Sequence, residues 1–139
     1  MRTNIQREIS QVVNGNKQNI ISLLEEFVNC NSYSHNKAGV DEMGKIVQRV
    51  MPKCFSHRII NNDSLGNHHL YSYSFKESRP IVLAGHLDTL CPADPAFNKL
   101  INCGKKLIGP GVNDMKGGNV VLIWSLKVLE RLDLLDRIP

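Results

Sequence analysis

Hydrophobic residues recur at three- and four-residue spacing in two early segments of the chain, which is the pattern of amphipathic helices. The first predicted helix covers about residues 17–31, and the second follows a polar connection over residues 31–37. Pro52 is expected to end the second helix, because proline cannot continue the helical hydrogen-bond ladder. The predicted inward positions are Ile20, Leu23, Leu24, Phe27 and Val28 in the first helix, and Val40, Met43, Val47, Val50 and Met51 in the second.

Extended patterns follow these helices. Residues 54–60 and 68–75 are predicted strands, and the residues between them are rich in Asn, Asp, Ser and Gly, which favour turns. The continuous apolar run at 81–84 is typical of a strand buried on both faces in the middle of an α/β sheet. Leu107 and Ile108 form a short extended piece after a tight turn at Gly104.

A last helix is predicted from near Gly117 toward Leu132. Its apolar stripe is broad, so we expect it to pack against a sheet. The alternation of helical and extended patterns along the chain predicts an α/β fold. The predicted inward positions of this helix and its continuation are Val121, Trp124, Val128, Leu132 and Leu135.

Composition fits one globular unit of 139 residues, with 42% apolar and 22% charged residues. The net charge of +4 comes from scattered basic residues without interleaved aromatics, so we expect no nucleic-acid binding. Residues 1–11 are polar and no apolar run approaches the roughly 20 residues of a membrane span, so we expect neither export nor a membrane anchor. The four cysteines are widely spaced, which favours reduced, mostly structural thiols in a cytoplasmic protein over a zinc knuckle or a disulfide framework.

The candidate chemistry lies just after the apolar run. His86 and Asp88 are two residues apart in an extended segment, so their side chains can share one side of the chain. A neutral imidazole is a good zinc ligand, and a nearby carboxylate can orient the ring. Asp114 follows a turn flanked by glycines at the start of the last helix, and a carboxylate can bridge two cations about 3.5–4 Å apart.

Simpler interpretations of the same residues stay open. A histidine next to an acid is a common structural pair, and Asp114 could be only a helix N-cap. The glycine turn before the last helix could hold a phosphate, although its spacing matches neither the Rossmann fingerprint nor the Walker loop.

In combination, the motifs resemble the co-catalytic zinc exopeptidases and amidohydrolases that include glutamate carboxypeptidase, aminoacylase, acetylornithine deacetylase and succinyl-diaminopimelate desuccinylase. The resemblance rests on Gly85-His86-Leu87-Asp88-Thr89, on Pro95-Ala96-Phe97, on Gly109-Pro110-Gly111-Val112-Asn113-Asp114-Met115-Lys116-Gly117-Gly118-Asn119, and on the two early helices. The stretch from Gly109 to Asn119 looks closest to glutamate carboxypeptidase. The resemblance implies a three-layer α/β domain with a mostly parallel sheet.

The resemblance also implies roles for individual residues. His86 would ligate one of two zinc ions and Asp114 would bridge both. Asp88 would be the catalytic-site carboxylate that orients His86, and the peptide bond from Asp114 to Met115 would be cis. The implied reaction is hydrolysis of a peptide or N-acyl amide bond next to a carboxylate-bearing residue, with water activated by zinc.

The family's later elements have no counterpart in residues 1–139: two adjacent glutamates that supply the general base and a ligand, a further acidic ligand, a lid and dimerisation domain, and a final histidine. The acidic pairs Glu25-Glu26 and Asp41-Glu42 lie in predicted helices and do not match. His68 and His69 would face opposite sides of a strand, so they are a poor ligand pair; His35 and His57 have no motif around them.

We therefore expect residues 1–139 to be the N-terminal segment of a catalytic domain, without the lid domain and the C-terminal catalytic segment. This segment should hold zinc weakly and lack turnover when alone. Apolar surface around Val82 and Val121 should be exposed and cause marginal stability or self-association. The alternative is a non-catalytic truncated product, or a binding or dimerising module that retains the fold.

Overall fold

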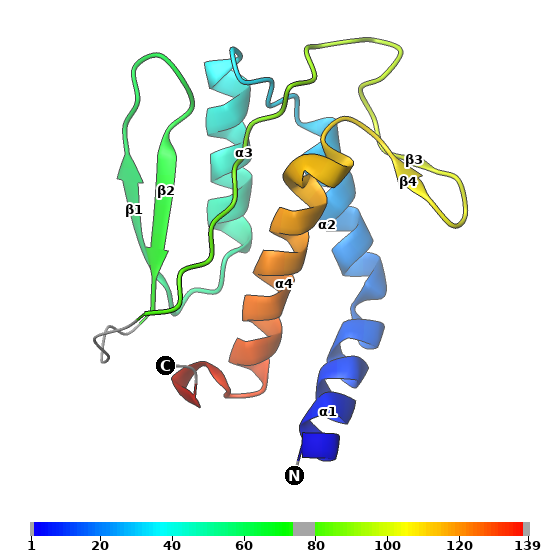
Figure 1. Cartoon of the computed structure of the whole chain (residues 1–139), viewed down its shortest axis with the longest axis vertical. Coiled ribbons are helices and arrows are strands. Elements are labelled where there is room, and N and C mark those ends of the chain that lie inside the picture. The colour runs from blue at the N-terminus through cyan, green and yellow to red at the C-terminus, as the bar shows by residue number, and fades with distance from the viewer. Residues whose placement is uncertain (1, 74–79, 138–139) are drawn as a thin grey trace.

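The computed structural model describes residues 2–73 and 80–137 and shows a helical core with two small sheets (Figure 1). The core lies among α2 (Lys17–Asn29), α3 (Lys37–Val50) and α4 (Gly117–Arg131). The buried residues that form it are Leu23, Phe27, Met43, Ile46, Val47, Met51, Val120 and Ile123. The predicted helices at 17–31 and after residue 37 are confirmed, and all of their predicted inward residues except Ile20, Leu24 and Val50 are buried.

A helix that the sequence analysis did not predict precedes α2. α1 (Arg2–Gly15) contacts α4 and joins α2 almost without interruption, because the Asn16 amide donates to the Val13 carbonyl and Asn16 accepts from Ile20. The signal was present, since Ile5 and Ile9 recur at helical spacing and are half-buried. The abundance of polar residues in this segment obscured it.

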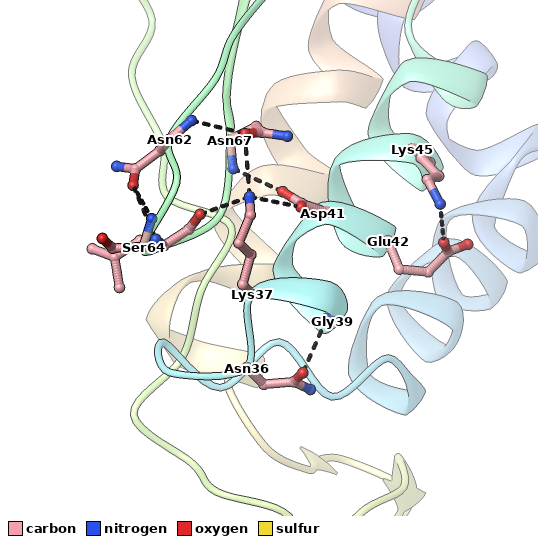
Figure 2. Close-up of polar contacts among 10 residues, drawn as sticks. Asn36, Lys37, Gly39, Asp41, Glu42, Lys45, Asn62, Ser64 and Asn67 are labelled. Carbon is pink, nitrogen blue, oxygen red and sulfur yellow. Dashed lines mark hydrogen bonds and ion pairs between the residues drawn. The ribbon is translucent and has the colours of Figure 1, made fainter.

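The hairpin of β1 (Ser56–Ile60) and β2 (His68–Ser72) is antiparallel and lies beside α3 (Figure 1). Its turn is held to the first turns of α3 by the Asp41 carboxylate and by the Lys37 ammonium, which donates to the Leu65 carbonyl at 3.0 Å (Figure 2). Asp41 accepts from the Asn67 amide at 2.8 Å and from Lys37 at 2.9 Å. The Asn67 hydrogen bond and then the Lys37 contact lower the pKa of Asp41. The predicted strands at 54–60 and 68–75 are confirmed over Ser56–Ile60 and His68–Ser72; residues 74 and 75 lie outside the described residues.

Two glycines let the hairpin approach α3 closely. A Cβ at Gly44 would overlap the imidazole of His69, and a Cβ at Gly66 would overlap the side chain of Val40. His69 also contacts His57, with 3.0 Å between Nδ1 of His69 and Nε2 of His57. His68 is exposed on the other side of β2, as expected for neighbours in a strand, so the two adjacent histidines do not share a site.

The prediction of a buried strand at 81–84 is wrong. This segment forms no strand, and its side chains are exposed: 58% for Ile81, 80% for Val82 and 56% for Leu83. An apolar run of this kind becomes buried where it joins a sheet whose two faces are both covered by other elements. Among the described residues, the pairing nearest to it is a single parallel bridge between Tyr33 and Thr89, beyond its end.

Because no strand forms at 81–84, the packing of α4 also differs from the prediction, although its predicted extent is confirmed. Val128 and Leu135 are buried as predicted, but Val121 is 66% exposed, and Val120 and Ile123 point into the core instead. The helix packs chiefly against α2 and not on a sheet. The predicted extended piece at 107–108 is confirmed as β4 (Leu107–Ile108), which pairs antiparallel with β3 (Ile101–Asn102).

The chain therefore combines helices with small antiparallel sheets. All four cysteine thiols are free, those of Cys54 and Cys103 at the surface and those of Cys30 and Cys91 half-buried. No helix within residues 2–73 and 80–137 is long and apolar enough to cross a bilayer.

Candidate metal centre

The sequence-predicted residues His86, Asp88 and Asp114 lie together. Nε2 of His86 is 2.9 Å from Oδ1 of Asp114, although 28 residues separate them along the chain. On the other side of the ring, Nδ1 of His86 lies 2.9 Å from the Asp88 backbone carbonyl and 3.4 Å from Oδ1 of the Asp88 carboxylate. The imidazole thus lies between two acidic residues, and the side chains of His86 and Asp88 lie near each other.

A side chain of helix α4 holds the backbone at His86. The side-chain amide of the buried Asn119 donates to the His86 backbone carbonyl at 2.6 Å. Gly85 permits this contact, because a Cβ at that position would overlap Oδ1 of Asn119. The His86 amide in turn faces the sulfur of Met115 at 3.5 Å. These contacts fix the backbone of His86 although the segment before it pairs with no strand.

The turn Val112–Lys116 (η1) presents Asp114 to the imidazole. Gly111 opens the turn with φ of 71°, and its carbonyl accepts from the Lys116 amide at 2.9 Å. Asp114 and Met115 have non-helical backbone angles, and the peptide bond between them is cis, as the resemblance implied. The N-cap position of α4 is Lys116, so the interpretation of Asp114 as a simple cap is not supported.

A buried lysine anchors this turn. Lys116 is 2% exposed and donates from Nζ to the Cys30 carbonyl at 2.8 Å, which ties the turn to the end of α2. Burial lowers the pKa of Lys116, against smaller opposing contributions from Cys30 and Cys91. Lys116 also lines a cavity of about 350 Å³ together with Thr89, Asn31, Asp94 and Asn98.

Electrostatics at His86 favour a cation. Burial alone would lower the pKa of His86, but the hydrogen bond to Asp114, the Asp88 carbonyl and the two nearby carboxylates outweigh burial, so the pKa is raised. The site is open to solvent, since the side chains of His86, Asp88 and Asp114 are 45%, 43% and 75% exposed. Positive charge at this position is therefore stabilised, and there is room beside it for further groups.

The donor set fits part of a zinc site. With Nδ1 of His86 directed at Asp88, Nε2 is the atom available to a metal, and it faces a carboxylate oxygen. An imidazole nitrogen and a carboxylate oxygen are both ordinary zinc ligands, but structural and catalytic sites have three or four protein ligands. Within residues 2–73 and 80–137, no group of three or more His, Cys, Asp or Glu is arranged to hold a metal ion.

Other acidic residues are engaged elsewhere. Asp41 is paired with Lys37, Glu42 with Lys45 and Glu26 with Arg49. Two residues that contribute to the site were not singled out from the sequence. Asn119 lies within the glycine-rich motif and could have been examined, whereas Ser34, which donates to Asp88 from 54 residues away, carries no sequence signal. In a search against models of known protein families, none matches this chain.

Proposed function

We propose that this chain is the N-terminal segment of the catalytic domain of a zinc-dependent exopeptidase or amidohydrolase that resembles glutamate carboxypeptidase. The observation that carries the proposal is the 2.9 Å approach of His86 Nε2 to Asp114 Oδ1, with Asp88 behind the ring. The proposed reaction is hydrolysis of a peptide or N-acyl amide bond, and the proposed location is the cytoplasm. The complete domain would have three layers and a mostly parallel sheet.

Each site residue has its own proposed role. His86 and Asp114 would hold metal, and Asp88 fixes the ring so that Nε2 faces the open side of the site. Zinc, when bound, supplies Lewis-acid polarisation of the amide carbonyl and lowers the pKa of water. The second oxygen of Asp114 is free to bridge a second ion, because this side chain is 75% exposed. The acidic pairs at residues 25–26 and 41–42 lie in α2 and α3, and neither is proposed as the general base.

Metal titration of the purified chain tests the ligand assignment. We expect weak, saturable zinc binding by calorimetry, and loss of the metal on dialysis against a mild chelator, because two protein ligands make an incomplete site. His86→Ala and Asp114→Ala should each abolish the binding. His68→Ala is the matched control, since it removes an exposed histidine outside the site. Binding that persists in both site variants would refute the assignment, and zinc retained against the chelator would reveal further ligands.

Activity assays test the reaction class. With zinc added, the chain alone should not hydrolyse N-acyl amino acids or peptides that end in glutamate, because loss of a general base alone costs roughly 100- to 10,000-fold in rate. A version extended by a segment with the two glutamates, the lid and the final histidine should be active and should lose activity in His86→Ala and Asp114→Ala. Turnover by the extended version that survives both substitutions would rule out these ligands.

The alternative function is a non-catalytic binding or dimerising module. The exposed apolar side chains of Ile81, Val82 and Leu83 favour it, because such a run on a surface is available to a partner. The nucleotide sequence beyond codon 139 separates the two proposals. A continuation that encodes the glutamate pair in frame supports the enzyme, and its absence from every frame supports the module.

A further inference from the structure

The loop between α2 and α3 reaches the metal centre through one hydroxyl. Oγ of Ser34 donates to Oδ2 of Asp88 at 2.6 Å, and the same oxygen lies 3.2 Å from the Thr89 carbonyl. A hydroxyl has a single proton, and the shorter contact with the charged acceptor is the stronger of the two. Ser34 therefore belongs to the surroundings of His86, although 54 residues separate it from Asp88.

The two oxygens of the Asp88 carboxylate have different neighbours. Oδ2 accepts from Ser34, while Oδ1 faces Nδ1 of His86 at 3.4 Å. With one oxygen held by a hydrogen bond, rotation of the carboxylate is restricted and the other oxygen stays beside the imidazole. Because Asp88 is 43% exposed, water would compete for both oxygens if the hydroxyl were absent.

We infer that Ser34 is a positioning residue of the metal centre, which acts on His86 through Asp88. The Ser34 hydroxyl is not needed to hold the loop in place, because backbone hydrogen bonds already join the loop to the 86–89 segment. The Ser34 amide donates to the Thr89 carbonyl at 3.0 Å, and the Thr89 amide donates to the Ser32 carbonyl at 2.8 Å. These bonds survive in Ser34→Ala, so this substitution removes only the contacts of the hydroxyl, the short one with the Asp88 carboxylate and the longer one with the Thr89 carbonyl.

The same loop supplies a matched control. Ser32 is fully buried two residues away, and its hydroxyl has no hydrogen-bond partner among the described residues. Ser32→Ala therefore makes the same chemical change in the same loop without affecting Asp88. Ser34→Thr keeps the hydroxyl at the site and is the conservative variant.

The first test needs no metal. Ring nitrogen and proton shifts of His86 are recorded by NMR in the wild-type chain, Ser34→Ala, Ser34→Thr and Ser32→Ala, with His86→Ala to assign the signals. We expect the Nδ1 shift of His86 to move in Ser34→Ala and to stay at its wild-type value in Ser34→Thr and Ser32→Ala. An unchanged His86 signal in Ser34→Ala overturns the inference, as does a Ser34→Thr spectrum that matches Ser34→Ala.

The second test rests on the proposed function. Residues that orient a metal-ligating histidine contribute about 10- to 100-fold to metal affinity. Ser34 contacts Asp88 and would act on the histidine through it. We expect roughly 10-fold weaker zinc binding by calorimetry in Ser34→Ala and wild-type affinity in Ser32→Ala. Wild-type affinity in Ser34→Ala overturns the step from Asp88 to the metal. A wild-type chain that binds no zinc refutes the proposed function, whereas the NMR comparison still decides the role of Ser34.

Discussion

The contact between α3 and the β1–β2 hairpin differs sharply from the segment 80–88 that carries the candidate site. In the first region, glycines bring the elements together, and Asp41 has two hydrogen-bond partners from different parts of the chain. In the second, three successive apolar side chains are more than half exposed, and the side chains of His86, Asp88 and Asp114 are 45%, 43% and 75% exposed. The hairpin contact is buried within this chain, whereas the site region leaves apolar surface and polar side chains open to solvent.

The largest expected effect on stability comes from adding a methyl group at the contact between α3 and the hairpin. Gly44→Ala places a Cβ against His69, which cannot move freely because it also contacts His57. We expect the free energy of unfolding to fall by about 1–3 kcal/mol in urea titration. Gly15→Ala is the control, because Gly15 lies at the end of α1 and a Cβ there would meet nothing within 4 Å. The control should be neutral or stabilising, and equal losses in both variants would contradict the packing argument.

The carboxylate at the hairpin turn should have a smaller effect. Asp41→Ala removes the acceptor for the Asn67 amide and Lys37, and we expect a loss of about 1–2 kcal/mol in the same titration. Glu42→Ala is a matched control in the next position, where an exposed pair with Lys45 should contribute nothing measurable (Figure 2). A loss in Glu42→Ala equal to that in Asp41→Ala would show that helix charge, and not the turn contact, is responsible.

The contribution of Asp41 should depend on pH with a definite sign. Its pKa is lowered in the folded chain, so the stabilisation is fully present above the ordinary value of 3.8 and is lost as pH falls through the lowered value. The difference in stability between the wild-type chain and Asp41→Ala should therefore shrink as the pH falls below 3.8. A difference that does not shrink would mean that the carboxylate charge is unimportant.

These two regions also explain what the sequence could predict. The amphipathic spacing in α2 and α3 is a local property, and it located both helices and most of their buried residues. The pair of His86 and Asp114 was anticipated only because the motifs around them resemble a known family, since spacing alone could not join segments 28 residues apart. Ser34 was missed for the same reason, because its partner lies 54 residues away.

The prediction at 81–84 was wrong for a different reason. Apolar character indicates that burial of a segment is favourable. It does not supply the other elements that would bury the segment. Val121 in α4 was misplaced with it, because the helix was expected to cover a sheet and instead turns Val120 and Ile123 toward α2 and α3. Both errors concern surfaces that need a partner outside their own element.

The smallest expected effect on stability comes from a substitution in the exposed apolar run at residues 81–83. Val82 is 80% exposed, so Val82→Lys removes almost no buried apolar contact, and we expect the free energy of unfolding to change by no more than about 0.5 kcal/mol at low protein concentration. Self-association should respond much more, because a charge in the middle of the exposed run makes strand pairing or apolar contact between two copies unfavourable. Sedimentation velocity over a range of concentrations should show a wild-type chain that associates and a Val82→Lys chain that stays monomeric. Lys105→Ala, which changes a charge on the exposed loop between β3 and β4, is the control and should associate like the wild type. A large loss of stability in Val82→Lys would show that Val82 is buried in solution and that the contrast between the two regions is wrong.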